Sequence, residues 1–149
     1  MANTFWNKIL GGSGKAEDVD YYEEGVALGR EGRYHDALTS LRLALKESPG
    51  DPIVLQQIAI MYTRIGMEEE AVKTYRHVLS RNPGEPGAHY GLAFLLLRGG
   101  HQEEAVEHLT AFLDRPPVAA SAARHVAYAH GALKDILGED SRARARSSA

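Results

Sequence analysis

The sequence repeats itself every 34 residues, and this period limits the fold more than any other feature of the chain. Glycine, alanine, proline and arginine each recur three times at this step, with no insertion between units. Periods of this length are typical of arrays whose units are small supersecondary elements that bury their apolar faces against their neighbours. The recurring positions are Gly32, Gly66 and Gly100; Ala37, Ala71 and Ala105; Pro49, Pro83 and Pro117; and Arg30, Arg64 and Arg98.

Within each unit the apolar residues follow a helical period. They are spaced by three and four residues, which places them on one face of a helix and excludes the alternation of a strand. The glycine column lies between two such stretches, where one helix ends and the chain turns. Asp51-Pro52 and Glu85-Pro86 precede the next stretch, and proline suits the first turn of a helix. Each unit is therefore predicted to be a helix, a tight turn and a second helix.

The order of residues within the unit resembles the tetratricopeptide repeat. That motif is a bulky residue, a Leu-Gly pair, an aromatic residue, then alanine, a bulky residue and proline. The resemblance implies an all-α fold, a right-handed α-solenoid of three helix-turn-helix repeats over residues 18–51, 52–85 and 86–117. The middle unit matches the motif with Leu55, Ile58-Ala59, Tyr62, Gly66, Ala71, Tyr75 and Pro83.

Two positions depart from the motif. Glu24 stands where the motif has leucine, and a charge is costly in a core. We therefore expect the first helix to be less buried, or Glu24 to be paired. Phe112 stands where Ala44 indicates a small side chain, so the third unit must open there against the segment that follows.

An alanine-rich stretch over residues 118–138 follows the third unit and is predicted to be a helix that ends at Gly138. Solenoids need a terminal element with a solvated outer face, so we interpret this helix as a cap. Residues 139–149 contain three arginines and no bulky apolar residue, and are predicted to be disordered.

The first helices of such units line the concave side of the stack, and the resemblance implies that this face binds a peptide or an amphipathic helix of a partner protein. Apolar residues there would hold the partner's apolar side chains, and the arginines would suit acidic flanks. The predicted groove residues are Tyr22, Val26, Arg30, Gln56, Ile60, Thr63, Arg64, Tyr90, Phe94, Leu97 and Arg98.

Two alternatives apply to these residues. Each arginine of the column precedes an acidic residue by six positions, at Asp36, Glu70 and Glu104, and such local surface pairs contribute only ~0–1 kcal/mol each. Tight curvature of the stack would instead bury the apolar column in the molecule's own core.

A short apolar segment precedes the repeats. Phe5, Trp6, Ile9 and Leu10 share one face of a predicted helix, and Gly11–Gly14 follow as a linker. This docking segment, within residues 1–17, has three alternative places: the first unit, the groove of another copy, which would give self-association, or another protein or membrane interface. A segment of this size would hold a membrane only weakly.

The composition excludes several function classes. The chain has no cysteine, which excludes disulfides and thiolate chemistry, and its formal net charge is −3, so no nucleic-acid partner is expected. No apolar run reaches the ~20 residues of a transmembrane span, and the N-terminus lacks the pattern of a signal peptide, so a cytoplasmic location is expected. The histidines and carboxylates form no recognised metal or catalytic spacing, so we expect no metal, no cofactor and no enzyme activity.

Two hypotheses follow. The first is a non-enzymatic adaptor or scaffold that binds a peptide or helix of a partner protein in the groove. The second is a self-assembling or membrane-complex-associated structural subunit, docked through Phe5–Leu10.

Overall fold

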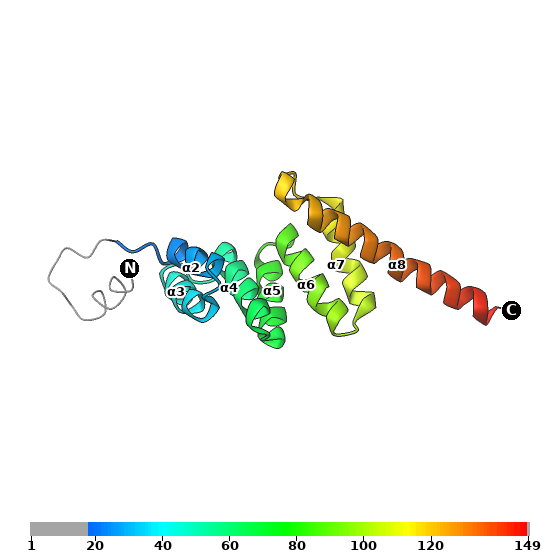
Figure 1. The fold of residues 1–149 in the computed structure, drawn as a ribbon, viewed down its shortest axis with the longest axis horizontal. Coiled ribbons are helices and arrows are strands. Elements are labelled where there is room, and N and C mark those ends of the chain that lie inside the picture. Colours follow the sequence, from blue (N-terminus) through cyan, green and yellow to red (C-terminus); the bar gives the residue numbers. More distant parts are fainter. Residues whose placement is uncertain (1–17, 149) are drawn as a thin grey trace.

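A computed structural model describes residues 18–148, and the predictions made for residues 1–17, including Phe5, Trp6, Ile9 and Leu10, lie outside it. Within the described range the chain is all-helical, as predicted, and its helices follow one another in a row (Figure 1). The elements are α2 (Tyr21–Arg30), α3 (Tyr34–Glu47), α4 (Pro52–Ile65), α5 (Glu68–Arg81), α6 (Pro86–Arg98), α7 (Gln102–Asp114), η1 (Ala120–Ala122) and α8 (Ala123–Ser147).

The helices pack in sequential pairs, α2 with α3, α4 with α5 and α6 with α7. The glycine column makes the turn inside each pair. Gly32, Gly66 and Gly100 adopt positive φ angles of 79°, 82° and 79°, a left-handed conformation that side chains rarely allow. The turns between pairs also follow the prediction, since the side chain of Asp51 accepts a 2.9 Å hydrogen bond from the backbone of Ile53.

Small residues allow the two helices of each pair to approach closely. Ala37, Ala71 and Ala105 are completely buried on the second helices. On the first helix of the first pair, a Cβ added to Gly25 would lie 2.6 Å from the Leu41 side chain. The alanine column and Gly25 are therefore packing positions.

Both departures from the motif have a structural outcome. In α2 only Gly25 is buried, and Glu24 is half-buried without a salt bridge among residues 18–148, so the first helix is the less buried one. Phe112 is only 1% exposed and packs in a cluster with Ala129 and Ile136 of α8, as the bulky side chain predicted.

The last helix extends further than the sequence predicted. α8 continues through Gly138 to Ser147, so residues 139–147, which we expected to be disordered, are helical. Alanine and arginine favour helices, and Arg144 and Arg146 lie in the last turn, where cations interact favourably with the helix dipole. Local propensity therefore maintains a helix there with little burial, because Ile136 is its last buried residue.

Candidate protein-binding groove

The first helices of the three pairs form one continuous face. The backbone of α4 packs close to those of α2 and α6, whereas among residues 18–148 the backbones of α3 and α5, and of α5 and α7, do not pack in this way. The first helices are therefore closer together than the second helices, which places them on the inner side of the stack. We call this face, made by α2, α4 and α6, the inner face.

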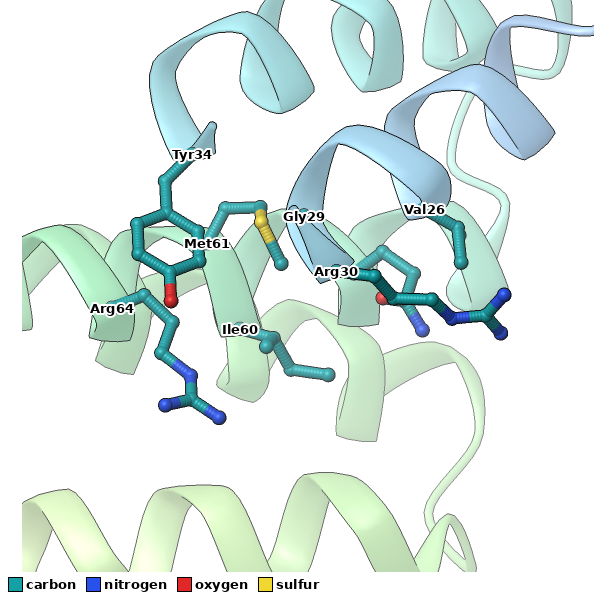
Figure 2. A pocket seen from close by; sticks show the side chains of 8 residues that line it. Val26, Gly29, Arg30, Tyr34, Ile60, Met61 and Arg64 are labelled. Atoms are coloured by element: carbon teal, nitrogen blue, oxygen red, sulfur yellow. The ribbon is translucent and has the colours of Figure 1, made fainter. Parts of the chain in front are cut away.

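The apolar column of the inner face is accessible. Val26, Ile60 and Phe94 are half-buried, so the curvature of the stack does not seal them in the core. An open hollow of about 370 Å³ lies beside Ile60, between the first and second pairs (Figure 2). We call it the Ile60 hollow; it is lined by Val26, Gly29, Arg30, Tyr34, Gln57, Ile60, Met61 and Arg64.

Four of the lining residues were predicted groove residues, and the others extend the set. Met61 is a core residue that lines the hollow beside Gly29, where a Cβ would lie 3.0 Å from the methionine methyl group. Tyr34 begins α3, a second helix, and therefore falls outside any search confined to first helices. The missing side chain at position 29 makes room for Met61, a contact between two repeats.

The third pair presents an aromatic cluster in place of a hollow. The ring centroids of Tyr90 and Phe112 lie 5.2 Å apart, and those of Phe94 and Tyr128 lie 6.4 Å apart. Tyr128 of α8 is 45% exposed and extends the apolar column onto the last helix. The sequence analysis missed it, although the step of 34 residues from Phe94 leads directly to position 128.

The remaining predicted groove residues are half-buried but lie outside the Ile60 hollow. Tyr22 packs against the core of the first pair, and Leu97 packs against the third. The Thr63 hydroxyl donates a 2.9 Å hydrogen bond to the Ala59 carbonyl, a bond within its own helix. Gln56 lies beside Gly87 of α6, in the packing between the second and third pairs.

The three arginines of the column have different surroundings. Arg98 forms a 2.8 Å salt bridge with Glu68, and its guanidinium carbon lies 5.7 Å from the centroid of the Phe94 ring. Arg30 and Arg64 are exposed, and no carboxylate of residues 18–148 lies within 4.0 Å of either.

The alternative of local pairs across each turn is therefore wrong in the described structure. Asp36 pairs with Arg33 at 2.8 Å, and Glu104 pairs with Arg76 at 2.7 Å. Asp36 pairs with Arg33 because the two residues are three positions apart at the start of one helix. Glu104 pairs with Arg76 because the neighbouring pair of helices brings that arginine next to it. Asp36 and Glu104 are thus paired elsewhere, Glu70 forms no salt bridge among residues 18–148, and the first two arginines of the column stay on the inner face.

Comparison with known proteins supports the repeat architecture. A family model described as the tetratricopeptide repeat matches residues 69–120, from α5 to the start of η1. The match covers about a third of the chain, and the three helical hairpins in a 34-residue period extend the same architecture from α2 to α7. The chain therefore contains tetratricopeptide repeats.

Solved structures resemble this repeat protein over most of its length. The type III secretion translocator chaperone SycD of Yersinia enterocolitica has a TM-score of 0.72 and 17% identity, covering 80% of this chain and 91% of SycD. PcrH, solved with the chaperone binding region of PopD, has a TM-score of 0.71 and 16% identity, covering 80% and 90%. YrrB, described as having an unusual peptide-binding site, has a TM-score of 0.62 and 24% identity, covering 72% and 55%. A comparison with curated proteins gives no match.

Among residues 18–148, no three His, Cys, Asp or Glu side chains gather in a way that would ligate a metal ion. Within the same range, none of the helices combines the length and apolar character needed to cross a membrane.

A histidine pair joins the two helices of the third repeat. His89 Nδ1 and His108 Nδ1 are 2.9 Å apart, and His89 Nε2 lies 2.7 Å from the Pro83 carbonyl oxygen, to which it donates. With both rings neutral, His89 Nδ1 therefore accepts and His108 Nδ1 donates. Glu104 lies one turn before His108 on the same helix, and its carboxylate is 3.8 Å from His108 Nε2. His89 and His108 are half-buried and hydrogen-bonded to each other, which the sequence analysis missed.

We expect the repeat protein to lose stability as the pH falls below about 6.5. Burial, and secondly the neighbouring His89, hold the pKa of His108 below its usual value. The unfolded chain then binds more protons, so this contribution to stability is complete above pH ~6.5 and is lost as the pH falls through the folded-state pKa. The pKa of Glu104 is lowered by the hydrogen bond from Arg76, so this carboxylate stays ionised in that range.

Thermal unfolding followed by circular dichroism between about pH 8 and pH 5 measures this loss. His108→Gln should flatten the dependence of the melting temperature on pH, whereas His130→Gln, at an exposed position of α8, should keep it. Equal pH dependence in the wild type and His108→Gln would contradict the assignment.

Proposed function

We propose that this tetratricopeptide repeat protein is a non-enzymatic interaction module that binds a peptide or helix of a partner protein along its inner face. The observation that carries the proposal is the accessible apolar column, which runs from Val26 through Ile60 and Phe94 to Tyr128 on the alternate helices α2, α4, α6 and α8. Apolar side chains that the core does not enclose, next to an open hollow, are what a partner's apolar anchors require.

The structural neighbours support the same class of function. SycD was solved with a peptide of the translocator YopD, and PcrH with the chaperone binding region of PopD. Both share the fold over 80% of this chain. A peptide-binding role is thus compatible with the architecture, while the partner of this chain is defined by its own side chains.

Selection from a displayed library of random twelve-residue peptides, followed by fluorescence anisotropy on the strongest binder, tests the proposal. Ile60→Glu and Phe94→Glu should each weaken binding at least tenfold, because an unpaired carboxylate would face the partner's apolar anchor. Val118→Glu is the matched control, since Val118 is fully exposed and lies outside the inner face.

Two outcomes would contradict the proposal. One is a library that yields no binder to the full chain. The other is a selected peptide that binds Ile60→Glu and Phe94→Glu as well as it binds the wild type, while circular dichroism shows both variants folded.

A further inference from the structure

The Ile60 hollow differs chemically from the rest of the inner face. Arg30 and Arg64 are its only fully charged lining residues, and no acidic side chain lines it. Figure 2 shows the two arginine side chains on opposite sides of Ile60. The hollow therefore combines an apolar floor with a cation on each side.

At the other end of the inner face the third arginine is already engaged. Arg98 is bound to Glu68 at 2.8 Å, and the surface beside it is aromatic, with Phe94 and Tyr128. A carboxylate arriving there would compete with Glu68 for the guanidinium. Of the three arginines of the column, Arg30 and Arg64 are thus the two without a carboxylate partner among residues 18–148, although the sequence repeats the arginine in all three units.

We propose that the Ile60 hollow binds a partner segment in which one bulky apolar residue is flanked on both sides by aspartate or glutamate. The apolar side chain would sit against Ile60 and Met61, and the two carboxylates would each accept hydrogen bonds from one guanidinium. Arginine presents several N–H donors in a planar fork that matches a carboxylate. The proposal rests on the proposed function, since it assigns the partner's chemistry at one part of the same face.

The position of the two arginines favours side-chain carboxylates over a chain terminus. A single terminal carboxylate would need both guanidinium groups to converge on one point, whereas they lie on either side of Ile60 (Figure 2). Two separate carboxylates, one before and one after the apolar residue, fit this arrangement.

Charge also distinguishes this partner from the chain's own apolar segment. The stretch from Phe5 to Leu10 carries Lys8 and no acidic residue, so it offers nothing to Arg30 and Arg64. The whole chain has a net charge of −3, so the two arginines of the hollow are a local positive site on a molecule that is acidic overall. Such local complementarity favours one binding register over others.

The peptide selection described above, carried out on the full chain, tests this inference. Enriched peptides should share an acidic, apolar, acidic pattern. The strongest of them is then synthesised with its acidic residues replaced by glutamine, and separately with an amidated C-terminus. Glutamine should weaken binding about tenfold, whereas amidation should leave it unchanged.

Variants of the protein complete the test. Arg30→Gln with Arg64→Gln should weaken the wild-type peptide about tenfold and reduce the dependence of its affinity on salt. Arg98→Gln is the matched control. It removes an arginine of the same column whose guanidinium is already paired with Glu68. Its effect on the selected peptide should be less than threefold.

The possible failures are distinct. A library without any binder would overturn both this inference and the proposed function. Binders without acidic residues, or equal affinity for the wild type and the double arginine variant, would overturn this inference alone. Loss of binding on amidation would also overturn it, because the carboxylate would then be the chain terminus.

Discussion

Replacing Phe112 with alanine is expected to lower the free energy of unfolding by about 3–5 kcal/mol, the usual cost of removing a phenylalanine from a core. Phe112 is 1% exposed, and its ring lies 5.2 Å from that of Tyr90. It also belongs to the cluster that holds Ala129 and Ile136 of α8. The cavity would therefore weaken both the third repeat and its contact with the last helix.

Urea unfolding followed by circular dichroism measures this loss, and hydrogen exchange in α8 shows whether the last helix separates first. Phe94→Ala is the matched control. It removes the same side chain from a half-buried position on the inner face, so its cost should be clearly smaller. Equal losses for the two variants would contradict the role assigned to Phe112.

Replacing Gly91 with alanine is expected to destabilise the protein by about 1–3 kcal/mol, the range for overfilling a packed core. A Cβ at this position would overlap the phenol ring of Tyr75, which is 4% exposed and belongs to the core between the second and third repeats. The expected sign is unusual, because alanine in place of glycine inside a helix normally stabilises it by ~0.5–1 kcal/mol.

Gly131→Ala provides the matched comparison. Gly131 lies inside α8, is exposed, and has open space where a Cβ would be. This variant should be more stable than the wild type, and Gly91→Ala less stable, in the same urea experiment. A stabilised Gly91→Ala would show that α5 and α6 are not packed as closely as described.

The features that follow from local sequence could be predicted, and the glycine turns are the clearest example. The turn at Gly66 depends only on the positive φ angle that this glycine adopts. The hydrogen bond from the Ile53 backbone to the Asp51 side chain is also local, because it joins residues two positions apart. The 34-residue period repeats the same helix, turn and helix three times. The three hairpins, and the face formed by their first helices, can therefore be predicted from one unit.

Several features that were missed depend on contacts between helices. Arg98 pairs with Glu68, thirty residues earlier, because stacking brings the end of α6 near the start of α5. The bond between His89 and His108 joins the two helices of the third repeat. The residues of a single helix do not specify such partners, because the partners depend on how the helices pack.

The small number of buried residues in α2 has a consequence for the Ile60 hollow. Half of the hollow's wall belongs to the first repeat, whose first helix contributes only Gly25 to the buried set. Terminal repeats of solenoids can unfold locally while the rest stays folded. Local unfolding of the first repeat would separate Arg30 from Arg64 and remove the Ile60 hollow. A ligand in the hollow would contact both of the first two repeats and would bind only when the first repeat is folded. Ligand binding would therefore stabilise the folded first repeat.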